Sequence, residues 1–191
     1  MATKAKAKAA KKKTTKAVAK KVKTSSAPSG KKQFLDSFAR EHATTLKVLR
    51  AFPAEQGEFR PHPRSKNARE LAWTLVGEQG LLSRAIQDQL DLSRMGAPPK
   101  APEDFRAIVD QFEQASAAVV DLIKKTSDSV LNGTVKFFTG PGKIADWPKM
   151  QIAWFMLSDQ IHHRGQMTVY LRMAGGKVPS IYGPSADEPW V

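Results

Sequence analysis

Four segments of the chain carry apolar residues at the three- and four-residue spacing of amphipathic helices. This pattern predicts helices over residues 32–52, 67–90, 103–126 and 148–174. Ser65 or Asn67 is expected to cap the second helix, and Pro102 is expected in the first turn of the third. Residues 132–148 are rich in glycine, proline and aromatic residues, which predicts a long ordered connector. Four amphipathic helices with one long crossover indicate an all-α fold, an antiparallel four-helix bundle.

Polar residues interrupt the apolar stripes of two helices. In the last helix, Asp159 and His163 are four residues apart, so their side chains lie on one face. In the second helix, Glu78 stands in a stripe of leucines. Because unpaired buried polar groups are costly, we expect these three side chains to share a partner or an ion inside the bundle. Five apolar residues are predicted to share their inward face in the last helix: Ile152, Phe155, Met156, Tyr170 and Met173.

Two carboxylates and one imidazole suit a divalent cation such as zinc, manganese, iron or nickel, with water in the open coordination positions. A bound water of lowered pKa would be the reactive species, and His162 or Gln166 would orient the ligands. Thr74 is expected to pack within its helix and to hold a water weakly. Tyr170 is expected in the core, with its hydroxyl reaching the same pocket, where an unknown small molecule would bind.

A purely structural role is the alternative for these residues. Asp159 and His163 would then form an ion pair that locks the last helix, and Glu78 would pair with Arg84 or a loop lysine.

Four further residues have expected structural roles. Arg164 lies opposite Asp159 on the helix and is expected to anchor the C-terminal segment or another helix. Gly165 is expected to permit close helix approach. His42 and His62 have no partner in the sequence and are expected at the surface.

The positive charge of the chain is concentrated at its N-terminus. Residues 1–32 hold twelve lysines and no acidic residue, whereas the remainder holds nineteen basic and eighteen acidic side chains. We therefore divide the chain into a basic tail, residues 1–31, and a bundle, residues 32–191. The tail resembles lysine- and alanine-rich histone-like tails and is expected to be disordered. It is predicted to bind DNA, RNA or another polyanion without base specificity through Lys11, Lys12, Lys13, Lys20, Lys21 and Lys23; the alternative is a solubilising arm.

Other features of the composition limit the class of protein. Cysteine is absent, which excludes disulfides, thiolate nucleophiles and cysteine-ligated zinc. No apolar run approaches the roughly 20 residues that span a bilayer, and the lysine-rich start does not lead into a secretory signal. These features predict a cytoplasmic protein without a membrane segment, associated with the nucleoid where its tail binds DNA.

Three stretches carry a family resemblance: FRPHPRSKNARELAWTLVGEQ (59–79), FFTGPGK…DWP (137–148), and HHRGQ with YLRMAGGKVPSIYGPSADE near the C-terminus. They resemble the DinB-like family of damage-inducible four-helix-bundle proteins, which is distinct from the translesion polymerase of that name. The resemblance covers about residues 33–191. It implies a divalent metal held by three histidines, one on the second helix and two on the last. Some relatives transfer low-molecular-weight thiols, and the resemblance also implies a homodimer.

The chain departs from this pattern at two of the three ligand positions. Thr74 and Asp159 stand where relatives carry histidine, and only His163 matches. Any metal must therefore be held differently, with Glu78 as the added ligand. Three functions remain open: a metal-dependent hydrolase or transferase, a non-catalytic stress-response or interaction module without metal, and a nucleic-acid-associated protein that acts through its tail.

Overall fold

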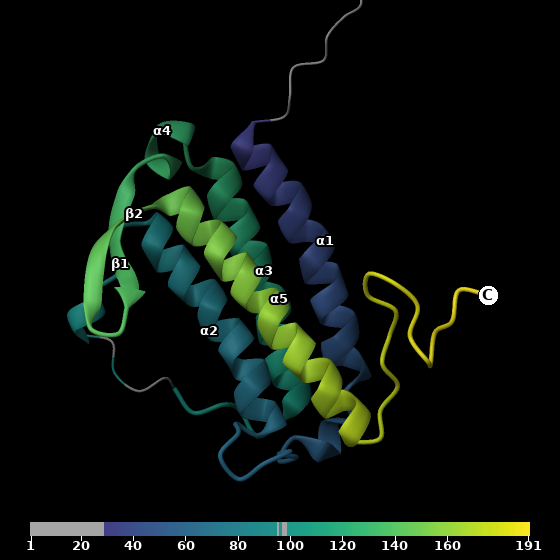
Figure 1. Cartoon of the computed structure of the whole chain (residues 1–191). Helices are drawn as coiled ribbons and strands as arrows, with labels where there is room; N and C mark the ends of the chain where they lie inside the picture. The colour runs from purple at the N-terminus through teal and green to yellow at the C-terminus, as the bar shows by residue number, and fades with distance from the viewer. Residues whose placement is uncertain (1–28, 95, 97–98) are drawn as a thin grey trace, which may run out of the picture.

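The computed structural model describes residues 29–94, 96 and 99–191, and the predicted basic tail lies almost wholly outside these residues. Four long helices form an antiparallel bundle in which α5 packs against α1 and α2, and α2 packs against α3 (Figure 1). The predicted four-helix bundle is therefore confirmed, with a small β-hairpin added to it. The long helices are α1 (Gly30–Ala51), α2 (Ala68–Ile86), α3 (Phe105–Lys125) and α5 (Lys149–Met173). The short elements are η1 (Ala54–Gln56), η2 (Leu92–Arg94), α4 (Asp128–Leu131), β1 (Thr134–Gly140) and β2 (Lys143–Pro148).

Side-chain caps determine where α2 and α3 begin. Asn67 accepts a hydrogen bond from the Glu70 backbone N–H, and the Glu70 side chain accepts one from the Asn67 N–H, which makes a complete capping box. The prediction that Asn67 caps α2 is confirmed. The prediction for Pro102 is wrong, because α3 begins at Phe105 and Asp104 supplies the cap. A short polar side chain that can accept from a free N–H defines the start of α3 better than proline does.

Two hydrophobic clusters fill the bundle, one toward each end. The first surrounds Leu49, Leu75 and Phe112, and the second surrounds Phe38 and Ile123. Four buried polar residues, one from each long helix, fall between these clusters along the chain: Thr45, Gln79, Ser116 and Gln160. The core is therefore divided near its middle by a polar layer.

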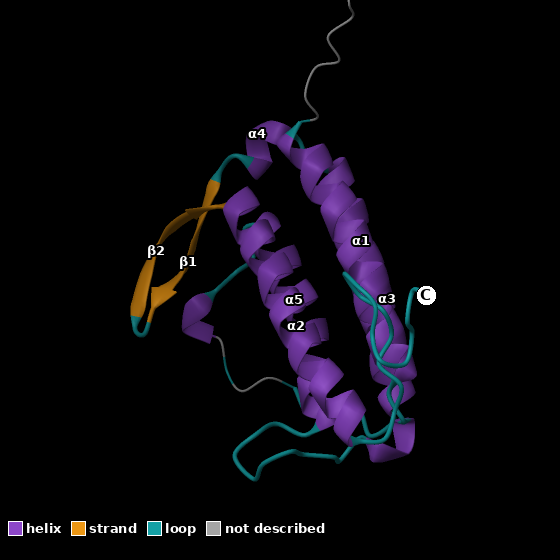
Figure 2. Cartoon of the chain, turned by 45° about the vertical axis from the view of Figure 1, so that its right-hand side comes forward, coloured by secondary structure: helices purple, strands orange, loops and turns teal. Residues whose placement is uncertain are grey.

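The connector between α3 and α5 contains an antiparallel hairpin that projects to one side of the bundle (Figure 2). Gly142 at its turn has φ of +67°, a left-handed conformation that glycine adopts without strain. Phe137 is buried, and its ring lies 5.9 Å from that of Trp147 and 6.1 Å from that of Phe155. These aromatic contacts attach the hairpin to α5.

Three expectations for α5 are wrong. Phe155 and Met173 were expected to face inward, but they are 44% and 55% exposed. Gly165 is exposed, and a side chain there would meet no atom within 4 Å, so it permits no close helix approach. The physical reason is that α5 has only α1 and α2 as close neighbours among the long helices, which leaves a broad outer face uncovered.

The segment after α5 folds back along the bundle beside α1 (Figures 1 and 2). The Arg164 side chain, 2% exposed, lies 2.7 Å from Glu41 Oε2 on α1, and its Nη2 donates to the Tyr182 hydroxyl at 2.5 Å. The expectation that Arg164 anchors the C-terminal segment or another helix is confirmed, and the side chain contacts both. Within the described part of the chain, no helix has the length and apolarity needed to cross a membrane.

Candidate metal centre

Glu78 of α2 and the pair Asp159 and His163 of α5 meet where these two helices pack. One potential ligand atom from each residue lies within 4.8 Å of the other two. The helical period accounts for the meeting, because residues 159 and 163 are one turn apart on the face of α5 that packs against α2. The structure therefore brings the three predicted ligands together.

His163 is in direct contact with Glu78. Its Nδ1 lies 2.6 Å from Glu78 Oε1, and 3.8 Å from Asp159 Oδ1. The side chain of Glu78 is 6% exposed, that of His163 is 17% exposed and that of Asp159 is 36% exposed. Exposure thus increases from Glu78, which is buried, to Asp159, which is partly open to solvent. The structural alternative is corrected in one respect, because Glu78 pairs with His163 and not with Arg84 or a lysine.

Burial and hydrogen bonding act on the proton affinity of this pair. Burial raises the pKa of the Glu78 carboxyl group, partly offset by its hydrogen bond with His163. The same hydrogen bond raises the pKa of His163, partly offset by burial. Both directions favour a state in which the pair keeps one proton between Nδ1 and Oε1. A cation that binds both groups must displace this proton.

The second oxygen of Glu78 distinguishes the site from a simple ion pair. Glu78 Oε2 is buried and has no hydrogen-bond partner. A buried carboxylate oxygen without a partner costs free energy, so native structures rarely retain one without a reason. The donor set therefore fits a divalent cation: a buried oxygen that lacks a partner, a neighbouring imidazole, and a more exposed carboxylate beside open coordination positions.

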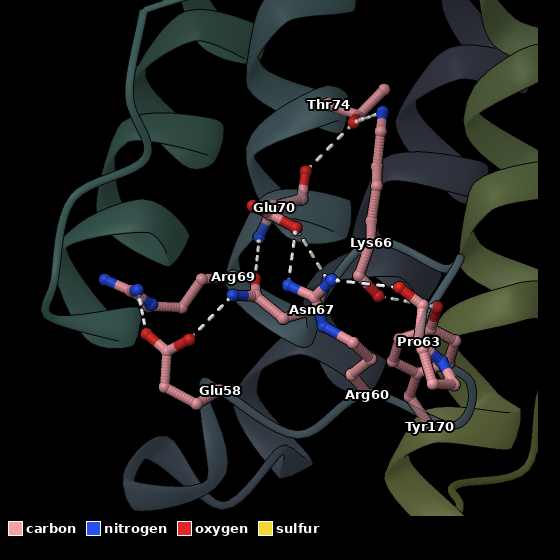
Figure 3. Close-up of polar contacts among 9 residues, drawn as sticks. All are labelled: Glu58, Arg60, Pro63, Lys66, Asn67, Arg69, Glu70, Thr74 and Tyr170. Atoms are coloured by element: carbon pink, nitrogen blue, oxygen red, sulfur yellow. Dashed lines mark hydrogen bonds and ion pairs between the residues drawn. The ribbon is translucent and has the colours of Figure 1, made fainter.

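Thr74 lies one turn before Glu78 on α2, at the position where the family resemblance implies a histidine. Its hydroxyl donates to the Glu70 carbonyl at 3.0 Å and accepts from Lys66 Nζ at 2.6 Å (Figure 3). The hydrogen bond with Glu78 raises the pKa of His163, and the positive charge of Lys66 lowers it by less. Nothing in the sequence pattern pointed to Lys66, because its place depends on the conformation of the loop before α2.

The other residues predicted near the site lie beside it. His162 Nε2 and Gln166 Nε2 are 3.0 Å apart on the exposed face of α5, and the His162 ring lies 5.3 Å from that of His163. Tyr170 is buried, and its hydroxyl donates to the Lys66 carbonyl at 3.0 Å. These contacts place His162 and Gln166 at the outer rim and Tyr170 against the loop before α2.

The two remaining histidines differ from each other. His62 is exposed, as expected. His42 is not a surface residue: its ring lies 5.1 Å from that of Phe112 and stacks on Phe38, and its Nδ1 is buried without a partner. The expectation for His42 is wrong because the aromatic residues of α1 and α3 cover it.

A cavity of about 500 Å³ lies at the end of α1, lined by residues that include Phe52, Phe105 and Arg106. None of the three residues of the ligand cluster lines this cavity. A small molecule at the cluster would approach from the side of Asp159, the most exposed of the three side chains.

Residues 19–190 of the chain match the sequence model of the DinB family. The chain belongs to the DinB family. YrdA, an uncharacterized protein of Bacillus subtilis, is 31% identical over 159 residues, covering 81% of this chain and 89% of YrdA. This DinB-family chain also resembles solved structures of its fold. A DinB-like protein of Bacillus cereus is 25% identical, with a TM-score of 0.66 over 79% of this chain and 97% of that one. A DinB-like protein of Bacillus subtilis is 15% identical, with a TM-score of 0.61 over 78% and 97%.

Proposed function

We propose that this DinB-family protein binds one divalent cation through Glu78, Asp159 and His163, and uses it in hydrolysis or group transfer. The observation that carries the proposal is the buried Glu78 Oε2, which has no hydrogen-bond partner although it lies beside two further ligand side chains. Zinc, manganese, iron and nickel all suit two carboxylates and an imidazole. A cation held there supplies Lewis-acid activation of a substrate oxygen and lowers the pKa of a bound water.

The three side chains have different tasks in this proposal. Glu78, the most buried of the three, provides a charge on the interior side of the cluster. His163 provides the nitrogen donor once its proton has left. Asp159, the most exposed of the three, is accessible both to a substrate and to a proton released during the reaction. Three protein ligands with open positions are the arrangement found in catalytic metal sites.

Elemental analysis of untagged protein, purified without chelator, tests the proposal. We expect close to one equivalent of a divalent metal in the wild type and a strong loss in Glu78→Gln. Protein that carries no metal, and that takes up none of zinc, manganese, iron or nickel when each is titrated in, would refute it.

A non-catalytic module is the second candidate, and one observation favours it. The 2.6 Å contact between His163 and Glu78 already satisfies one oxygen of the carboxylate without any metal. In that case the pair only stabilises the packing of α2 against α5.

The basic tail suggests an additional property that is independent of the site. The tail holds eleven lysines and no acidic residue, and it is joined to a nearly neutral bundle, which favours binding to nucleic acid or another polyanion through phosphate charge. In this proposal the tail determines where the protein resides, and the cluster on α2 and α5 determines its chemistry.

A further inference from the structure

Lys66 is held from both ends beside the candidate metal centre. Its backbone carbonyl accepts a hydrogen bond from Tyr170 of α5, and its ammonium group donates to Thr74 of α2. Figure 3 shows the side chain extending from the loop along the side of α2 to Thr74. The two helices that carry the ligand cluster therefore also position this lysine.

The ammonium group lies on the same side of α2 as the cluster. Thr74 precedes Glu78 by four residues, so the two side chains are neighbours on one helix face, with Cβ atoms about 5–6 Å apart. Lys66 thus places a positive charge beside the ligand cluster.

Stability alone does not account for this arrangement. The contact between Lys66 and Thr74 is exposed, and the Thr74 hydroxyl already has a partner in the Glu70 carbonyl. Immobilising a lysine side chain costs rotamer entropy, and an exposed polar contact returns little. An ammonium group has three donors, and only one of them is used by Thr74 in this contact.

The charges around the site indicate the charge that a bound ligand would carry. Glu78 and Asp159 together balance a divalent cation, and Glu70 is engaged by Arg60 at 3.5 Å and by the Asn67 N–H. One positive charge, that of Lys66, is then left over beside the ligand cluster. A single negative charge neutralises it, whereas a doubly charged group would leave the site negative.

Resting on the proposed metal site, we infer that this protein acts on a substrate with a monoanionic carboxylate group, which binds between the cation and the Lys66 ammonium group. Lys66 is then a specificity-determining residue, and Thr74 holds it in place where relatives carry a metal ligand. A lysine acts on such a group as a point charge, so its contribution depends on charge more than on side-chain shape.

Acetate binding to the full chain loaded with cobalt(II) tests this inference, because the visible spectrum of the metal reports a ligand entering its coordination sphere. We expect acetate to bind Lys66→Gln at least 10-fold more weakly than wild type, and Lys66→Arg to restore most of the affinity. Arg64→Gln removes the same charge from an exposed position in the same loop and should leave the acetate affinity unchanged. Cobalt affinity should be equal or higher in Lys66→Gln, because a like charge has been removed.

Each outcome separates this inference from the proposed function. If the wild type binds no cobalt, both fail. If cobalt binds but acetate binds equally well to wild type and Lys66→Gln, only the role of Lys66 is overturned. Loss of cobalt affinity in Lys66→Gln would show that the lysine supports the fold of the site, and would also overturn the inference. Tighter binding of inorganic phosphate than of acetate would overturn the assignment to a monoanion.

Discussion

Replacing His163 by alanine separates a metal site from a structural pair. Without metal, the substitution leaves Glu78, which is 6% exposed, with no partner on either oxygen. An unpaired buried polar group costs about 1–3 kcal/mol, and the partial exposure of Asp159 lets water reach the site. We therefore expect the free energy of unfolding to fall by about 2 kcal/mol in the presence of chelator.

With metal, the same substitution removes a second contribution. A cation present at 100 times its dissociation constant stabilises the folded state by about 2.7 kcal/mol through binding linkage. For a domain of this size, each kcal/mol shifts the melting temperature by about 2–4 °C. Wild type should therefore melt about 5–10 °C higher with metal than with chelator, and His163→Ala should show almost no difference.

Thermal unfolding of wild type and variant, each with zinc and with chelator, measures both contributions. His162→Ala is the matched control, because it removes the adjacent, exposed histidine from the same helix. This variant should keep the full response to metal. A wild type that melts at one temperature with zinc and with chelator would refute the linkage, and the His163 contact would then be structural only.

Three further predictions concern parts of the molecule outside the site. Burial lowers the pKa of His42 in the folded protein, so the unfolded chain takes up a proton at a higher pH than the folded chain does. The free energy of unfolding should therefore fall as the pH drops below about 6.5, by at most about 1.4 kcal/mol per pH unit. In urea titrations across this pH range, His42→Gln should flatten the slope and His62→Gln should not. Arg164→Met should lower the free energy of unfolding by about 3 kcal/mol, because the Glu41 carboxylate loses its charged partner and keeps only the Tyr182 hydroxyl. Arg172→Met, at a half-exposed pair, should cost under about 1 kcal/mol; equal losses in urea unfolding would contradict this. Removing residues 1–28 should abolish binding to double-stranded DNA at low salt and change the melting temperature by less than a few degrees; DNA retained by the shortened chain in a gel-shift assay would count against the tail.

The helices could be predicted from the sequence because their apolar spacing is regular. The hairpin could not, since its strands lie on the outside of the bundle and much of their surface stays exposed, so no clean alternation marks them. The outward placement of Phe155 likewise depends on the hairpin, whose aromatic residues it contacts. Helical periodicity shows in which direction around the helix axis a side chain points. It does not show whether another element of the fold packs on that side.

The helical period made it possible to predict that Glu78, Asp159 and His163 lie close together. It did not predict which two of them are in direct contact. The spacing of Asp159 and His163 brings their Cβ atoms together, yet the shorter contact of His163 is with Glu78, on another helix. Side-chain rotamers and the depth at which two helices pack decide such a contact, and neither can be read from spacing. Lys66 was not predicted at the site, because it lies in a loop, where helical periodicity gives no information about side-chain positions.

The ligand residues and the polar layer of the core are adjacent in the sequence. Gln79 follows Glu78, Gln160 follows Asp159, and Arg164 follows His163. Consecutive residues on a helix point about 100° apart, so one member of each pair reaches the site while the other reaches the interior.

The interior members set the position of the ligands without touching them. Gln79 donates to Gln160 at 3.1 Å, and Gln160 donates to Thr45 of α1 at 3.1 Å, so α2, α5 and α1 are joined at one level. Sliding α5 by one turn, about 5.4 Å, would break these buried hydrogen bonds together with the contact of Arg164 to Glu41. The register of α5 against α2, which places Glu78 opposite His163, is therefore set by neighbouring residues that are not themselves ligands. A scaffold built in this way can exchange the ligand residues themselves without losing the geometry that brings them together.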